Sequence, residues 1–209
     1  PRLDYTDSSC PALLLEPLRT NDVEHSEYFE GSGWGLLQAS LTANNSNSPE
    51  GLQNAYSFVP NTTNTTHLVY ETITKSAGTY SASCFFKADG YDYGNIRLAT
   101  DSDAKRYSVT IDLTDGTFAS QDTYGSPTST GYNIENIGNG WYRLSVTSAH
   151  SSGFIYHTIS LSNVASPTYN NGLPEFAGDG TKGVLIYGAQ IEAGSYATSY
   201  IPTYGSSVS

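Results

Sequence analysis

Apolar and polar residues alternate with a period of two along several segments of this chain, and no segment shows the 3.6-residue period of a helix. The segment Arg106–Leu113 is the clearest case, because its odd positions are apolar and its even positions are polar. Successive side chains of a strand point to opposite faces, so the odd positions are expected to face a core. Such segments, separated by turn residues, are typical of an all-β sandwich.

Turn residues divide the alternating segments into expected strands. Asp115-Gly116 predicts a type I′ hairpin, because both central residues of that turn need positive φ. Gly138-Asn139-Gly140 predicts a similar turn before Trp141. The expected strands are 12–16, 36–43, 54–59, 67–74, 79–88, 94–100, 105–113, 117–121, 141–148, 154–162 and 183–192. The segments 44–50, 61–66, 122–130 and 166–180 are rich in turn residues and are expected to be exposed loops.

The alternation also assigns the faces of the strands. The side chains expected to face the core are Tyr80, Ala82, Cys84, Phe86, Ile96, Leu98, Tyr107, Val109, Ile111, Leu113, Tyr142, Leu144 and Val146. Those expected on the outer faces are Ser83, Phe85, Lys87, Asn95, Arg97, Trp141, Arg143, Ser145 and Thr147. Cys10 and Cys84 are the only thiols, too few for a disulfide framework, and Cys84 is expected to be a small buried hydrophobe.

The charge balance limits the kinds of partner. Nine Lys and Arg against 20 Asp and Glu give a formal net charge of −11. Binding to a phosphate backbone needs a basic patch, so no nucleic acid is expected. A neutral glycan or a protein suits an acidic surface better than a polyanion does, unless a cation bridges the two. No apolar run approaches the roughly 18 residues of a membrane span, so no membrane insertion is expected.

Two groups of residues are candidate binding sites. Tyr91 and Tyr93 flank Asp92 in a glycine-bounded turn, near Asn95 and Arg97. Two exposed aromatic rings beside an amide and a guanidinium can stack on a sugar ring and bind its hydroxyls. The alternative is a loop that covers a sheet edge. The second candidate group is Phe85, Trp141 and Arg143 on the outer strand faces.

The sequence offers no convincing catalytic set. A retaining glycosidase needs two carboxyls roughly 5 Å apart, and no expected strand carries acids at i and i+2 on one face. Glu24, Glu27 and Glu30 are spaced by three, which does not suit a strand face. His157 lies on the inward side of 154–161, so a core histidine with satisfied hydrogen bonds is expected. The chain is therefore expected not to be an enzyme.

Several motifs together resemble modules of bacteriophage tail-fibre and other virion-surface proteins over nearly the whole chain. They are Leu13-Leu14-Leu15-Glu16-Pro17, Ser26-Glu27-Tyr28-Phe29 with Trp34, Gly78-Thr79-Tyr80-Ser81, Gly138-Asn139-Gly140-Trp141-Tyr142-Arg143, Gly188–Gly194 and Tyr196–Pro202. More distantly, the layout is similar to carbohydrate-binding jelly rolls attached to xylan- and glucan-degrading enzymes. The resemblance implies a two-sheet antiparallel β-sandwich of the jelly-roll, concanavalin A-like or galactose-binding-like kind, spanning 1–209 as one module.

The resemblance also implies binding without chemistry. The expected function is glycan recognition by a phage virion fibre, at an extracellular or virion surface. The alternatives are a structural fibre domain, with a homotrimer as its assembly, and an accessory module of a secreted polysaccharide-degrading enzyme. Similar jelly rolls hold a structural calcium between the opening segment and the last strand. By this resemblance, Glu27, Glu30 and Glu192 are the expected oxygen ligands of a calcium ion, although the usual Asp of the last strand is missing.

Overall fold

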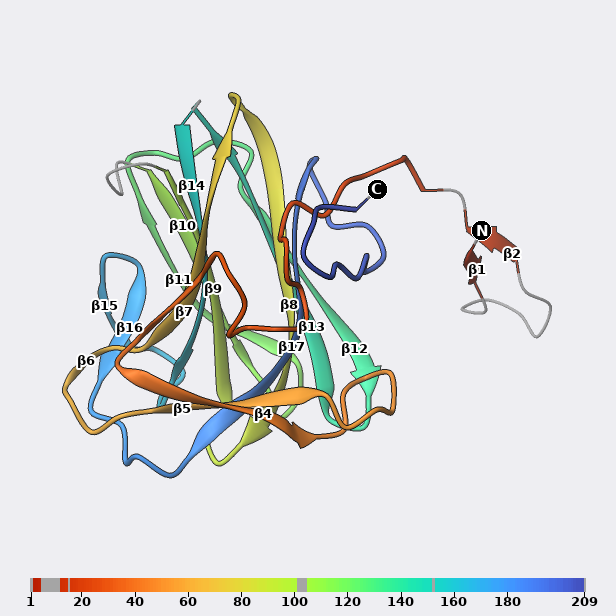
Figure 1. The fold of residues 1–209 in the computed structure, drawn as a ribbon. Helices are drawn as coiled ribbons and strands as arrows, with labels where there is room; N and C mark the ends of the chain where they lie inside the picture. Colours follow the sequence, from red (N-terminus) through yellow and green to blue (C-terminus); the bar gives the residue numbers. More distant parts are fainter. Residues whose placement is uncertain (1, 5–11, 15, 101–104, 152, 209) are drawn as a thin grey trace.

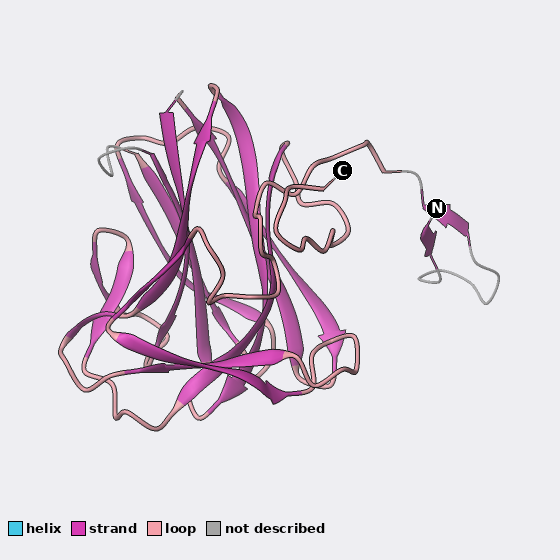
Figure 2. Cartoon of the chain, viewed as in Figure 1, coloured by secondary structure: helices cyan, strands magenta, loops and turns pink. Residues whose placement is uncertain are grey.

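The computed structural model describes the backbone of residues 2–4 and 12–14 and all of residues 16–100, 105–151 and 153–208 (Figure 1). In these residues every element is a strand and none is a helix (Figure 2). Two six-stranded sheets form a sandwich, and the named strands within each sheet pair antiparallel. This confirms the predicted all-β, two-sheet architecture.

Each sheet is described in its spatial order. Sheet I consists of β11 (Thr117–Tyr124), β10 (Arg106–Asp112), β9 (Tyr93–Thr100), β14 (Gly153–Ser162), β7 (Leu68–Lys75) and β3 (Trp34–Leu37). Sheet II consists of β12 (Gly131–Gly138), β13 (Trp141–His150), β8 (Gly78–Asp89), β17 (Gly183–Ala193), β5 (Ala55–Pro60) and β4 (Ala39–Ser46). Smaller sheets join β15 (Thr168–Asn170), β16 (Leu173–Phe176) and β6 (Thr65–Thr66), and β1 (Arg2–Asp4) with β2 (Ala12–Leu14).

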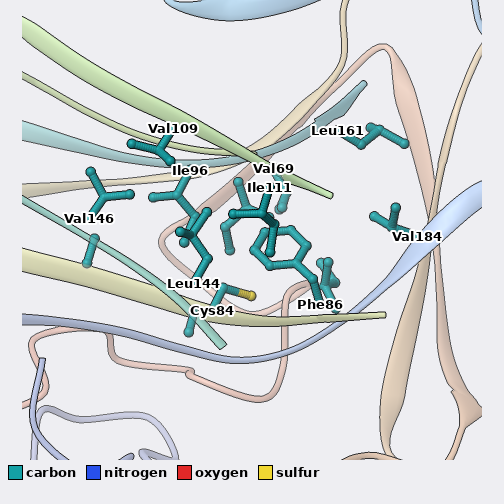
Figure 3. Close-up of a cluster of buried hydrophobic side chains, with 14 of the residues drawn as sticks. Val69, Cys84, Phe86, Ile96, Val109, Ile111, Leu144, Val146, Leu161 and Val184 are labelled. Carbon is teal, nitrogen blue, oxygen red and sulfur yellow. The ribbon is translucent and has the colours of Figure 1, made fainter. Parts of the chain in front are cut away.

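The core lies between the two sheets, and it contains the side chains that the alternation predicted. All thirteen residues expected to face inward belong to one buried cluster, part of which is drawn in Figure 3. Cys84 is a buried free thiol in this cluster, as expected, and burial raises its pKa. Cys10 lies outside the described residues.

The strand prediction was wrong at several places, including the short strand β6 within the expected loop 61–66. The segment expected as one strand over 36–43 changes sheet at Gln38, whose φ of 56° breaks the extended backbone between β3 and β4. The edge strand β12 was not predicted, because it is rich in polar residues and does not alternate clearly. The segment 166–180, expected as an exposed loop, contains β15 and β16, with Leu173 and Phe176 buried.

The turn types also differ from the prediction. A hairpin joins β10 and β11 at Asp115-Gly116, but of these two only Gly116 has positive φ, so the turn is not type I′. The loop is longer, and the Gly116 amide donates to the Asp112 carbonyl. Between β12 and β13, Asn139 and Gly140 both have positive φ, as a type I′ turn requires.

The segment after β17 packs on the outer side of sheet II, and the segment after β2 runs alongside β17, where the Asp22 amide donates to the Ile191 carbonyl. Figure 1 shows the segment after β2 and the segment after β17 side by side against this sheet, and bridges Asn21–Val208 and His25–Tyr204 join them. The buried Asn21 amide donates to the carbonyls of Ala189 and Ile201, and its oxygen accepts from the Ile191 amide. These bonds fix both segments to β17.

Candidate functional site

The first predicted group does not form an open surface. Asn95 and Arg97 lie on the outer face of sheet I, as expected, but both are buried. The Asn95 amide donates to the hydroxyls of Ser108 and Thr110, and Arg97 donates to the Asn171 carbonyl at 2.6 Å. Their hydrogen-bonding groups are therefore engaged inside the protein, and the expectation of an accessible amide and guanidinium was wrong.

The two tyrosines of this group are half-buried. Tyr91 packs edge-on against Phe176 with ring centroids 5.6 Å apart, and its hydroxyl accepts from the Asp179 amide. Tyr93 begins β9 opposite Asp112 and Ser162. Tyr91 thus holds the segment after β16 against the sheet, which is the alternative interpretation of this turn.

The hairpin formed by β15 and β16 covers Asn95 and Arg97. Its turn presents the Asn171 carbonyl to Arg97, and the Tyr169 hydroxyl bonds to Thr110 and Ser120. The sequence contains a local signal for this hairpin, although the segment 166–180 was expected to be a loop. Asn171-Gly172 is an Asn-Gly pair between Asn170 and Leu173, and both residues of the pair adopt positive φ, as in a type I′ hairpin.

The second predicted group also lies on the expected face, but it is buried. Phe85 and Trp141 form a second apolar cluster with Ala55, Leu185 and Tyr187 on the outer side of sheet II. Arg143 donates to the Thr198 carbonyl at 2.7 Å and to the Ser83 hydroxyl at 2.9 Å. The C-terminal segment therefore covers this group, so the expected exposure of Phe85, Trp141 and Arg143 was wrong.

The three glutamates expected to hold calcium are not brought together. The fully buried Glu192 accepts from the Thr198 amide and hydroxyl and from the Gln190 amide. Glu27 accepts from the hydroxyls of Tyr200 and Tyr204, whereas Glu30 accepts from Tyr56. No three acidic, His or Cys side chains gather as a metal site in the described part of the chain. Glu192 instead anchors the C-terminal segment through Thr198, so the expectation that these three glutamates share one calcium site was wrong.

His157 is in the core, but its hydrogen bonds are not satisfied. It is fully buried opposite Glu71 of β7, and neither ring nitrogen has a hydrogen-bond partner. Burial lowers the pKa of His157 to about 3. Burial also raises the pKa of Glu71 to about 7, with the charges of Glu24 and Asp22 adding to the effect. These groups face the interior between the sheets.

A large hollow of about 580 Å³ opens at one end of the outer face of sheet II. Its walls come from the end of β4, the loop between β4 and β5, β8 and the turn between β12 and β13. The lining residues are mostly amides and hydroxyls: Asn45, Ser46, Asn47, Ser48, Pro49, Gly51, Gln53, Lys87, Asn139 and Trp141. None of these residues carries a carboxylate, imidazole or thiol.

Local hydrogen bonds give the hollow its shape. The Trp141 indole Nε1 donates to the Asn47 carbonyl at 3.2 Å, which ties the loop to the floor of the hollow. The Gln53 amide donates to the Asn44 carbonyl, and Asn44 adopts a φ of 54° that turns the end of β4. Amide side chains both donate and accept hydrogen bonds, so this lining matches a ligand rich in hydroxyl groups.

The sequence located this hollow only in part. Trp141 belonged to the second predicted group, and the segment 44–50 was expected to be an exposed loop, where binding residues often lie. Lys87 was expected on an outer face, and it lies there. The sequence did not reveal that Trp141, the segment 44–50 and Lys87 lie together. Their proximity depends on long-range strand pairing, such as that of β13 with β8.

A smaller hollow of about 290 Å³ lies farther along β13. It is lined by Gly131, Tyr132, Asn133, Ser145, Thr147, Ser195, Tyr196 and Ala197. Tyr196 is about half exposed, at 52%, and Arg19 lies 5.7 Å from its ring centroid. Trp141 and Ser145 are four residues apart on β13, so roughly 13 Å separates the two hollows along the strand.

Comparisons with known proteins do not assign a family. No family model matches the chain, and no curated protein matches it. One similar solved structure is the enzymatically active domain of tailspike protein 4 from bacteriophage CBA120, with 14% identity and a TM-score of 0.43. Another is the CBM22-1 and GH10 modules of the Clostridium thermocellum N-terminal endo-1,4-β-D-xylanase 10B complexed with xylohexaose, with 13% identity and a TM-score of 0.44.

Both likenesses are partial. They cover 82% and 88% of this chain but only 21% and 29% of the respective matched chains. Both TM-scores and both identities are low, so neither likeness assigns a family or an activity to this chain. In the described residues, no helix is long and apolar enough to cross a membrane.

Proposed function

We propose that the chain binds a carbohydrate, without chemically changing it, in the large hollow between the β4–β5 loop, Lys87 and the Asn139-Gly140 turn. The observation that carries this proposal is the lining of the hollow, in which amides and hydroxyls surround the edge of Trp141. Sugar hydroxyls need partners that both donate and accept, because an unpaired polar group costs binding free energy. A rigid antiparallel sheet beneath the hollow keeps these partners in place.

The absence of chemistry is part of the proposal. General acid and base catalysis needs titratable groups within reach of the ligand, and glycoside hydrolysis needs two carboxyls. The described residues that line the large hollow include only one titratable side chain, that of Lys87. Glu71 and His157, whose pKa values are shifted by burial, lie between the sheets, on the opposite side of sheet II from this hollow.

The biological setting proposed is recognition of a surface glycan by a phage virion fibre. The sequence motifs that resemble virion-surface modules support it, and two of them lie at the large hollow or in the C-terminal segment. The motif at 138–143 forms the turn and floor of the large hollow. The motif at 196–202 anchors the C-terminal segment through Thr198 and Tyr200. A structural fibre domain and an accessory enzyme module remain the alternatives, and the sequence flanking this chain distinguishes between them.

The binding site is tested by removing amides that line the hollow. Asn45→Ala and Asn139→Gly are each expected to weaken glycan binding about threefold to tenfold, since each removes hydrogen bonds to the ligand. Glycine suits position 139 because it keeps the positive φ of the turn. A glycan array identifies the ligand, and calorimetry then measures the affinities of the variants.

The matched control is Tyr196→Ala in the smaller hollow. If Tyr196→Ala loses affinity while Asn45→Ala and Asn139→Gly do not, the binding site is the smaller hollow and the proposed location is wrong. If the wild type binds no glycan, the structural alternative is favoured.

The absence of catalysis is tested separately. Purified protein is expected to release no reducing ends and no unsaturated products from neutral or acidic polysaccharides, because the hollow lacks an acid–base pair. Product above the blank that persists in the Asn45→Ala and Asn139→Gly variants points to a contaminant or another site. Product that is lost in those variants contradicts the proposal.

A further inference from the structure

Among the residues that the structure describes, Lys87 has no partner for its charge in the wall of the large hollow. It lies on the outer face of β8, opposite Leu185 of β17, and it is half-buried. Within the described chain, no residue forms a hydrogen bond or ion pair with its ammonium group, and Lys87 lines the hollow. By contrast, Lys75 and Lys182 form ion pairs with Asp22 and Asp179.

The surroundings of Lys87 leave its charge uncompensated. No carboxylate is among the lining residues that the structure describes, and Glu50 does not line the hollow although it belongs to the β4–β5 loop. Asp89 is two residues from Lys87 on the same face of β8, but in the described structure it forms no ion pair with Lys87 and accepts a hydrogen bond from Ser57 at 3.2 Å. The hollow is thus a local cationic site in a chain of net charge −11.

The Lys87 stem has a packing role that must be separated from its charge. A Cβ added at Gly140 would lie 3.4 Å from Cε of Lys87, so the stem runs along the type I′ turn. Lysine commonly covers apolar surface with its methylene groups while the ammonium reaches water. Methionine keeps a stem of similar length without the charge, which makes Lys87→Met the informative variant.

We infer that the large hollow recognises a sugar residue that carries one carboxylate, such as a uronic or sialic acid within an otherwise neutral glycan. This inference rests on the proposed function. Lys87 binds the carboxylate as a point charge, and the amides of Asn45 and Asn139 bind the neighbouring hydroxyls. A polymer of uronic acids does not fit, because the net charge of −11 repels a polyanion beyond the hollow.

The test compares two probes that differ only in the carboxylate. The first is a neutral oligosaccharide with one glucuronic acid residue, and the second is the same molecule with its carboxyl reduced to an alcohol. The wild type is expected to bind the acidic probe about tenfold to a hundredfold more tightly, as a charge-assisted hydrogen bond implies. Lys87→Met is expected to remove this preference, so that both probes bind with similar affinity, while the melting temperature stays nearly unchanged.

Two further variants complete the design. Lys87→Arg is expected to keep the preference for the acidic probe because it keeps the charge. Lys105→Met removes an exposed lysine outside the hollow and is expected to change neither affinity. The preference of the wild type is also expected to fall as salt concentration rises.

The outcomes distinguish this inference from the proposed function. Equal binding of both probes by the wild type, or a preference that survives Lys87→Met, overturns the role of Lys87 but not carbohydrate binding. Failure of both probes to bind at millimolar concentration contradicts both proposals. If inorganic phosphate alone binds as tightly as the acidic probe and competes with it, the hollow recognises an anion and not a sugar acid, which also overturns the inference.

Discussion

Replacing Trp141 by alanine is expected to lower the free energy of unfolding by about 3–5 kcal/mol, the usual cost of removing a large buried aromatic side chain. Trp141 is only 2% exposed and packs with Phe85, Leu185 and Tyr187. The substitution leaves a cavity in this cluster. It also removes the hydrogen bond from the indole to the Asn47 carbonyl, which holds the β4–β5 loop. Urea denaturation measures the change.

Two variants calibrate this result. Trp141→Phe keeps most of the ring and loses the indole donor, so a smaller cost of about 1–2 kcal/mol is expected. Tyr196→Ala truncates a half-exposed aromatic ring on the same side of sheet II and is expected to cost less than about 1 kcal/mol. A Trp141→Ala protein within about 1 kcal/mol of the wild type contradicts the buried cluster. A loss of glycan binding in this variant does not by itself identify a contact, because the hollow loses its floor.

The sequence predicted the inner faces of the sheets well because side-chain alternation is a property of the strand itself. Tyr107, Val109 and Ile111 face the core for this local reason, and no distant residue is needed to infer it. Alternation also placed Asn95, Arg97 and Arg143 on outer faces correctly. It says nothing about what lies over an outer face, which depends on segments far away in the sequence.

The covering segments explain why the candidate sites were misjudged. Arg97 is covered by Asn171, which is 74 residues away, and Arg143 is covered by Thr198, which is 55 residues away. Some local signals existed, such as the Asn171-Gly172 pair that forms a hairpin turn. Others are recognisable only in the fold. Glu192 is a metal-ligand candidate by residue type, but in the structure its carboxylate holds the Thr198 amide and hydroxyl.

The buried pair Glu71 and His157 is expected to make stability depend on pH in two opposite ways. The pKa of His157 is lowered to about 3 by burial, so its protonation in the unfolded chain destabilises the fold as pH falls below about 6.5. The pKa of Glu71 is raised to about 7, chiefly by burial, so the folded state binds more protons than the unfolded state between about pH 4.5 and 7. The contribution of Glu71 to the free energy of unfolding therefore falls as pH rises through this window, and it is lowest above pH 7.

Glu71→Gln separates these two effects, because glutamine resembles the protonated acid at every pH. Relative to wild type, the variant is expected to gain roughly 2–4 kcal/mol of unfolding free energy on going from pH 4 to pH 8, as a pKa difference of about 2.5 implies. One carboxylate oxygen of Glu71 has no hydrogen-bond partner, so replacing it with an amide group changes the free energy of unfolding at every pH. For this reason the test compares the stability difference from wild type at pH 4 with the same difference at pH 8. The effect of the amide itself on stability does not depend on pH, so it cancels when the two differences are subtracted.

The matched control is Glu135→Gln, which changes an exposed carboxylate on the edge strand β12. Its stability relative to wild type is expected to be the same at pH 4 and pH 8. His157 is shared by all three proteins, so the acid limb of the stability curve is expected to persist in both variants. Urea denaturation at closely spaced pH values measures the curves. A Glu71→Gln protein whose stability relative to wild type is unchanged between pH 4 and pH 8 shows that Glu71 titrates normally, which contradicts its burial as a neutral acid.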